Sequence, residues 1–155
     1  MALFFQDYET LEIGHTWHTP ARTITQAEVD RFAQATGDTN PIHIDHAYAA
    51  RSSFGGTIVH GYLTIALAAG LVFQLGLDEV ASHAILSTNW RLTKAVRPGE
   101  DIHVVLTLLS RRPSRSQPGQ GIITRRYDVL NQQEEPVAIG EVTMLILARP
   151  AAAGA

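Results

Sequence analysis

The residue types best suited to chemistry stand together in the stretch Thr36-Gly37-Asp38-Thr39-Asn40-Pro41-Ile42-His43. It places a carboxylic acid, Asp38, five residues before an imidazole, His43. A carboxylate can take a proton from water, and an imidazole that titrates near neutrality can hold, take or return one. The addition of water across a double bond needs both events. The stretch is also good turn chemistry, so a loop in which Asp38 caps backbone amides and His43 is simply buried stays open here.

The sequence around the pair predicts how it is positioned. Thr25-Gln26-Ala27-Glu28 is a capping box that starts a helix, and apolar residues follow at helical spacing. Gly37 suits the left-handed conformation that ends a helix, and Pro41 lacks an amide hydrogen, so the helix cannot continue through the pair. We expect a helix over residues 25–37, followed by a turn that aims the acid and the imidazole at one point.

A long apolar stretch comes next. The sequence from Ile58 to Leu77 is apolar on nearly all sides, which raises the possibility of a membrane span. His60, Gln74 and three glycines interrupt it, and no basic residues flank it closely. We therefore expect a buried helix from Gly61 to about Leu75, capped by Gly76 at its C-terminus.

The apolar pattern then changes from helical spacing to alternation, which is typical of β-strands. The alternating segments are residues 86–92, 102–108, 123–129 and 142–146, and the third is expected to be more exposed. Short turns separate them, so we expect an antiparallel meander, with residues 15–19 as an edge strand. A sheet with one apolar face needs a cover, and the long helix is the only large one available. The expected fold is α+β, a sheet wrapped on a helix.

Composition limits the possible functions. A chain of 155 residues predicts one domain, over residues 1–150, with a frayed tail at 151–155. The net charge of −3 gives no indication of nucleic-acid binding. Because there are no cysteines, disulfides, thiolate metal sites and thiol nucleophiles are excluded. No basic region precedes the apolar start, so a signal peptide is not expected and a cytoplasmic location is.

A long ordered motif gives a family resemblance. The residues are Phe32-Ala33-x-x-Thr36-Gly37-Asp38-x-Asn40-Pro41-Ile42-His43-x-Asp45 and, later, Phe54-Gly55-Gly56-x-Ile58-Val59-His60-Gly61. They resemble the MaoC-like dehydratase family, which includes the (R)-specific enoyl-CoA hydratases. The resemblance extends weakly over nearly the whole chain and implies a hotdog fold and a homodimer whose sites are lined by both chains. It further implies that Asp38 and His43 activate water and that Gly61 offers its backbone amide to the thioester oxygen.

Other residues are predicted to contact the substrate. Asn40, His60 and Tyr62 lie within or beside the motif, and His60 is expected to support the motif loop or line the pocket more than to transfer protons. A later hairpin is rich in arginine, whose planar fork suits the phosphates of coenzyme A. The arginines concerned are Arg111, Arg112 and Arg115. A solvated turn is the alternative reading of this hairpin.

The activity expected from the resemblance is the reversible hydration of a trans-2-enoyl-CoA, or another enoyl thioester such as one on an acyl carrier protein, to an (R)-3-hydroxyacyl thioester. Coenzyme A belongs to the substrate, and no separate cofactor, metal, nucleic acid or membrane is expected as a partner. A hotdog acyl-CoA thioesterase and a non-catalytic acyl-thioester-binding module are the alternatives. A metal site built from His43, Asp45, His46 and His60 is disfavoured, because Asp45 is better used as a helix cap.

Overall fold

The computed structural model describes residues 2–77 and 79–150, so the expected tail at 151–155 lies outside the described part. The helices are α1 (Phe5–Thr10), α2 (Gln26–Thr36), α3 (Pro41–Ile44), α4 (His46–Ala50) and α5 (Gly61–Phe73). The strands are β1 (Thr16–His18), β2 (Arg22–Thr23), β3 (Ser82–Leu92), β4 (Asp101–Pro113), β5 (Gly121–Asn131) and β6 (Pro136–Ile146). Within the described residues they form one sheet in the order β1-β4-β5-β6-β3, with β2 also pairing with β4.

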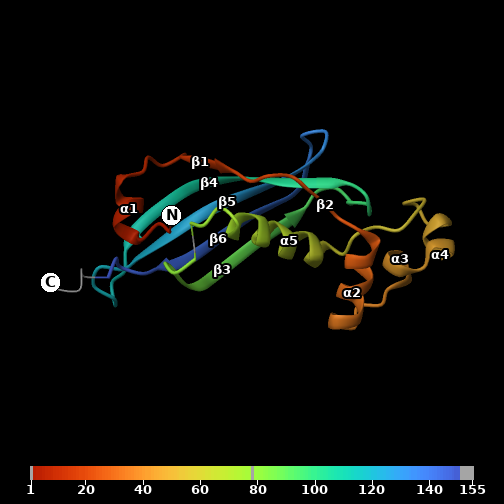
Figure 1. Ribbon diagram of the computed structural model, residues 1–155, viewed down its shortest axis with the longest axis horizontal. Coiled ribbons are helices and arrows are strands. Elements are labelled where there is room, and N and C mark those ends of the chain that lie inside the picture. The colour runs from red at the N-terminus through yellow and green to blue at the C-terminus, as the bar shows by residue number, and fades with distance from the viewer. Residues whose placement is uncertain (1, 78, 151–155) are drawn as a thin grey trace.

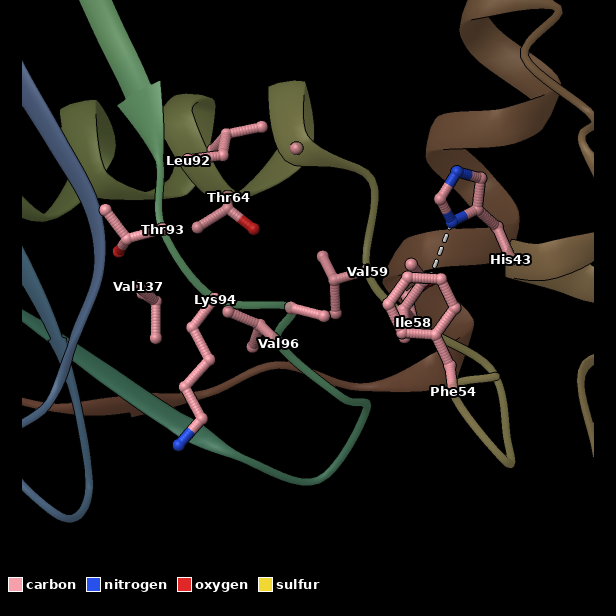
Figure 2. A pocket seen from close by; sticks show the side chains of 12 residues that line it. His43, Phe54, Ile58, Val59, Thr64, Leu92, Thr93, Lys94, Val96 and Val137 are labelled. Carbon is pink, nitrogen blue, oxygen red and sulfur yellow. Dashed lines mark hydrogen bonds between the residues drawn. The ribbon is translucent and has the colours of Figure 1, made fainter. Parts of the chain in front are cut away.

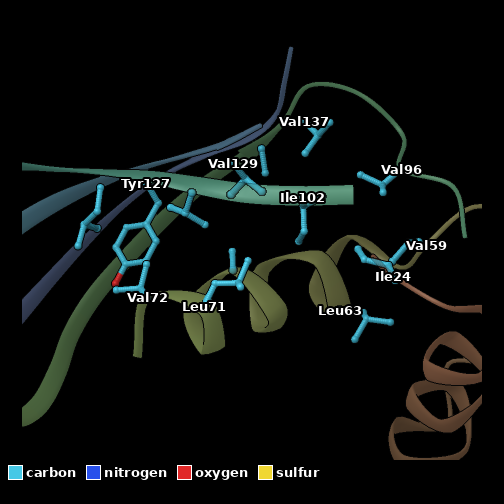
Figure 3. Packing of buried hydrophobic residues seen from close by; sticks show 14 of the residues in the cluster. Ile24, Val59, Leu63, Leu71, Val72, Val96, Ile102, Tyr127, Val129 and Val137 are labelled. Carbon is cyan, nitrogen blue, oxygen red and sulfur yellow. The ribbon is translucent and has the colours of Figure 1, made fainter. Parts of the chain in front are cut away.

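The sheet curves along one side of helix α5 (Figure 1). Every second residue of β4 from Ile102 to Leu108 is buried, and Ile102, Val104 and Leu106 are fully so. These side chains belong to one apolar cluster with Leu63 and Leu71 of α5 (Figure 3). Each buried side chain of this size stabilises the fold by roughly 1.5–3 kcal/mol, so the helix and the sheet hold each other in place. The α+β hotdog fold is confirmed.

The strand order differs from the expected meander. β4, β5 and β6 follow one another as predicted, but β3 pairs with β6 and not with β4. The other side of β4 is occupied by β1, where Trp17 is in register with Leu106, and by β2. Because the N-terminal strands take that side, β3 becomes the outer strand at the opposite edge of the sheet.

The expectation that residues 123–129 form a more exposed strand is wrong. β5 lies between β4 and β6, and Ile123, Arg125, Tyr127 and Val129 are all buried. The arginine is accommodated because polar atoms reach it: its guanidinium donates a hydrogen bond to the hydroxyl of Tyr8 on α1. Helix α1 was not expected, and it covers this end of the sheet.

The helices before α5 follow the predicted caps closely. Helix α2 has the capping box of Thr25 and Glu28, and it ends at Gly37, which is left-handed with φ +80°. The expected turn after it contains a short helix, α3, whose N-cap is Asn40. Helix α5 ends at Phe73 instead of near Leu75. None of the helices in the described residues has the length and apolar character that crossing a membrane requires.

Candidate active site

The predicted acid and imidazole lie close together, at the end of the molecule where α2 and α3 meet the N-terminus of α5 (Figure 1). Asp38 directly follows Gly37, and His43 lies on α3. One oxygen of Asp38 and one ring nitrogen each of His43 and His60 lie within 4.8 Å of one another. The helix stop and the short helix therefore bring an exposed carboxylate to a half-buried imidazole.

A backbone carbonyl orients the ring of His43. Its Nδ1 lies 2.7 Å from the carbonyl oxygen of Ile58 (Figure 2). Because a carbonyl can only accept, Nδ1 carries the hydrogen and Nε2 keeps its lone pair. His43 thus presents a nitrogen that can accept a proton or a hydrogen bond from water.

Gln26 is a supporting residue that the sequence did not reveal. Its side-chain amide nitrogen donates to the backbone carbonyl of His43, 2.9 Å away, and its oxygen accepts from the hydroxyl of Thr57 at 3.0 Å. The side chain therefore ties the first turn of α2 to α3 and to the loop before α5. Only the folded arrangement brings these segments together, so no local signal could have identified it.

His60 lies behind the site and not on its surface. The side chain is 1% exposed, and its Nε2 is 2.9 Å from the carbonyl oxygen of Asp38. Its ring stacks on that of His43, with centroids 3.8 Å apart and planes at 30°. His60 is absent from the residues that line the neighbouring cavity, and its predicted contact with the substrate stays a prediction. The other expectation, support of the motif loop, agrees with these contacts.

A cavity of about 270 Å³ opens beside His43 (Figure 2). Its remaining lining is mainly apolar: Phe54, Ile58, Val59, Gly61, Thr64, Leu92, Thr93, Lys94, Ala95, Val96 and Val137. Gly61 is the first residue of α5, where helix amides lack partners within the helix and the helix dipole is positive. A Cβ at Gly61 would lie 2.3 Å from Cδ1 of Leu92, so a larger residue would displace the leucine.

Asn40 and Tyr62 do not line this cavity. The side-chain oxygen of Asn40 accepts from the amide of Ile42 at 3.1 Å and caps α3. Tyr62 is 78% exposed and borders a neighbouring hollow, which shares Gly61 and Leu92 with this cavity. Asn40 therefore caps a helix, and the predicted substrate contacts of Asn40 and Tyr62 stay predictions.

The three arginines lie at the end of the folded molecule opposite to the acid–imidazole pair. Arg111 and Arg112 are in the last part of β4, and Arg115 is in the following hairpin. That hairpin contacts α1, since Gln6 donates to the carbonyl of Gly119 at 3.1 Å. Figure 1 shows α1 and α2 at opposite ends of the sheet. Within a single chain, the arginines and the acid–imidazole pair are not brought together.

Asp45 serves as a helix cap, as predicted: it caps α4 by accepting a hydrogen bond from the amide of Tyr48 at 2.9 Å. In the described residues, one group of side chains lies close enough together to suggest a metal ion, and it consists of Asp38, His43 and His60. A tetrahedral ion requires lone pairs that converge. Nδ1 of His43 and Nε2 of His60 already bond to backbone carbonyls, so these two atoms do not offer lone pairs to an ion.

An ion pair fixes the helix that delivers Asp38. Glu28 accepts a hydrogen bond from the amide of Thr25 at 2.8 Å and pairs with Arg22 on β2. Burial alone would raise the pKa of Glu28, but the hydrogen bonds from Thr25 and the positive charge of Arg22 outweigh it and hold that pKa below its usual value. The charged carboxylate thus joins the start of α2 to the sheet.

Known proteins are similar to this chain in sequence and in architecture. The chain is 38% identical to Protein MaoC of Klebsiella aerogenes over 67% of its own length, but it spans only 31% of that protein. It is 33% identical to a 3-hydroxybutyryl-CoA dehydratase of Methylorubrum extorquens, over 73% of this chain and 68% of the relative. The crystal structure of a MaoC-like dehydratase from Rhodospirillum rubrum matches with a TM-score of 0.82 at 29% identity, covering 97% of this chain and all of that one. The model of the MaoC-like domain matches residues 9–129. The chain belongs to the MaoC-like domain family.

Proposed function

We propose that this protein is a hydro-lyase that reversibly hydrates a trans-2-enoyl thioester, such as an enoyl-CoA, to the (R)-3-hydroxyacyl thioester. The observation that carries the proposal is a carboxylate oxygen of Asp38 within 4.8 Å of a ring nitrogen of His43, whose Nδ1 is bonded to Ile58, next to a cavity that Gly61 helps to line. Relatives named dehydratase and hydratase support the same class of reaction.

The mechanism follows from these positions. A water molecule donates hydrogen bonds to the carboxylate of Asp38 and to Nε2 of His43. Asp38, as general base, takes one proton while the oxygen of the water bonds to C3 of the enoyl group. The electron pair of the double bond moves to the thioester oxygen, where the amide of Gly61 and the positive end of α5 stabilise the enolate. The proton taken up by the pair is then delivered to C2.

The second chain of the proposed homodimer completes the substrate site. β3 is an outer strand, and exposed strand edges favour pairing with another chain. Apolar side chains lie exposed along β3 and α5: Tyr62, Phe73, Ile85, Leu86 and Leu92. Two β3 strands that pair antiparallel through their middles bring the Ser82 end of one chain to the Leu92 end of the other, beside Gly61.

This pairing also gives the arginine hairpin a role. Ser82 is in register with Ile146, which is in register with Gly121 at the hairpin end of β5. Neighbouring strands lie about 4.8 Å apart, so β4 with its arginines is roughly 14 Å across the sheet from β3. The long nucleotide arm of coenzyme A is suited to cross that distance. We therefore assign Arg111, Arg112 and Arg115 of the second copy to the phosphates of the substrate.

Incubation of the protein with crotonyl-CoA tests the proposal. Hydration removes the enoyl absorbance without releasing a free thiol. Release of thiol at the same rate would show a thioesterase instead. Binding without either change would show an acyl-thioester-binding module, and both results would overturn the proposed function.

A further inference from the structure

We propose that His60 is a positioning residue that holds Asp38 and His43 in their working arrangement without itself exchanging protons with the substrate. The inference rests on the hydration proposed above and names a group that this reaction would need. Three contacts of the residue carry it, one to each part of the site.

The first contact is with the acid. Nε2 of His60 donates to the backbone carbonyl of Asp38 at 2.9 Å. Asp38 is exposed and follows Gly37, the left-handed residue that ends α2. On its amide side, a 3.3 Å hydrogen bond to the hydroxyl of Thr36 holds it. The buried imidazole holds the carbonyl side, so it limits how far the Cα of Asp38, and with it the carboxylate, can move.

The second contact is with the catalytic imidazole. The ring of His60 packs against those of His43 and Phe32, with centroid distances of 3.8 Å and 5.0 Å. A ring that stacks on His43 opposes rotation of that side chain. The hydrogen bond from His43 to Ile58, and therefore the free Nε2, is preserved.

The third contact is through the backbone. His60 directly precedes Gly61, and its carbonyl accepts the amide of Thr64 at 3.0 Å, which starts the hydrogen bonding of α5. One residue thus connects the acid, the imidazole and the amide proposed for the thioester oxygen. Its ring is 1% exposed and does not line the cavity, so it has no direct path to the substrate.

Two substitutions separate the hydrogen bond from the ring. His60→Phe keeps an aromatic ring in the stack but removes the donor. His60→Gln places an amide donor at about the reach of Nε2 but removes the ring. We expect His60→Phe to lower kcat about five- to tenfold, the size expected for one hydrogen bond, with KM unchanged. We expect His60→Gln to stay within about threefold of the parent, and His18→Gln, which changes an exposed histidine on β1, to match the parent.

The Asp38→Asn background decides whether His60 acts through the acid. If it does, adding His60→Phe there lowers kcat little further, because residues that act as a unit are not additive. A full additional loss in that background would overturn the proposal. So would a kcat of His60→Phe equal to the parent's, or the disappearance of one limb of the pH–rate profile in both His60 variants, which would make His60 a proton carrier.

Amide hydrogen exchange over residues 37–43 supplies a readout that needs no turnover. His60→Phe should speed exchange in this segment, whereas His60→Gln should exchange at the rate of the parent. Failure of the parent to hydrate crotonyl-CoA would overturn the proposed function alone. Exchange unchanged in His60→Phe would overturn the role of His60.

Discussion

His43 and His60 are in contact, but each bonds to a different backbone carbonyl, and this bond fixes which ring nitrogen remains free. The carbonyl of Ile58 takes the Nδ1 hydrogen of His43, and the carbonyl of Asp38 takes the Nε2 hydrogen of His60. In each ring the opposite nitrogen keeps its lone pair. That nitrogen is directed to the site in His43, whereas Nδ1 of His60 is buried without a partner among the described residues. The surroundings, and not the residue type, leave one imidazole at the proposed site and bury the other behind it.

The acid–imidazole pair gives the first prediction. Asp38→Asn keeps the shape of the side chain but removes the base, so it should lower kcat about 10²–10⁴-fold, the usual size of a general acid–base contribution. His43→Ala should do comparable damage. The double variant should lose much less than the product of the two losses, because both groups act on one water. Steady-state hydration of crotonyl-CoA measures all three.

The thermal midpoint, taken from the same preparations, supplies the control. If Asp38 serves catalysis, Asp38→Asn should fold as well as the parent or better, since functional carboxylates are often held at a cost in stability. If Asp38 only caps the loop, the midpoint should fall while turnover per folded molecule stays near the parent value. The second result would remove the general base from the mechanism.

At the scale of elements, helix α2 is the part that delivers the acid, and its start is fixed electrostatically. The carboxylate of Glu28 closes the capping box with Thr25 and pairs with Arg22 of β2. A carboxyl whose pKa is lowered by folding adds stability above its unfolded pKa, and that stability is lost as the pH falls through its folded pKa. The contribution of Glu28 is therefore present at neutral pH and absent in acid.

Glu28→Gln tests this electrostatic contribution. At pH 7 it should lower the thermal midpoint by up to about 2–4 °C, the size of a loss of about 1 kcal/mol from a negative charge at the helix start and its pairing with Arg22 in a chain of this length. The difference from the parent should shrink below about pH 4, because the parent carboxyl is then protonated as well. Glu9→Gln, an exposed residue on α1 with the same change of charge, is the control. A difference that persists unchanged in acid would contradict the electrostatic account.

Elements set by neighbouring residues were predictable, and those set by distant ones were not. The capping box at Thr25, the left-handed Gly37 and the Asp45 cap each depend on a few consecutive residues, and all were identified. The burial of β5 could not be predicted, because an arginine in an alternating segment indicates an exposed strand and the hydroxyl that accepts from Arg125 belongs to Tyr8 of the distant helix α1. The place of β3 depends on which strand takes the free side of β4, which no local pattern encodes.

The site shows the same division between local and distant information. The closeness of Asp38 and His43 follows from a helix stop and a proline that lie beside them in the sequence. The burial of His60 and the hydrogen bonds of Gln26 to His43 and Thr57 involve segments far apart in the chain. The proposed acid–imidazole pair could therefore be predicted from the sequence, but the residues that support it, His60 and Gln26, could not be placed in this way.

At the scale of the whole molecule, the arginine hairpin tests whether the site is shared between chains. If Arg112 of the second copy binds a substrate phosphate, Arg112→Ala should raise KM several-fold with kcat little changed, as expected for lost uniform binding. Added salt should weaken binding more in the parent than in the variant. Arg126→Ala, which removes the same charge from a residue paired with Asp128, should leave KM unchanged. Unchanged KM in single alanine variants of all three arginines would show that the hairpin is a solvated turn that does not bind substrate.

The exposed apolar side chains of α5 and β3 give the test of assembly. Phe73 is 56% exposed on the helix and Ile85 is 62% exposed on the strand, and both lie on the surfaces proposed to meet in the dimer. A buried, unpaired carboxylate is costly, so Phe73→Glu or Ile85→Glu should shift the protein from dimer to monomer. Light scattering should show a parent mass of two chains or more, and the variants should lose activity as they dissociate because each site needs the other chain.

Ile13→Glu is the control: it changes an isoleucine that is 54% exposed near α1, away from that interface, and this variant should remain assembled. A monomeric parent with full hydratase activity would contradict both the dimer and the shared site, and would leave the reaction to the acid–imidazole pair and Gly61 of a single chain.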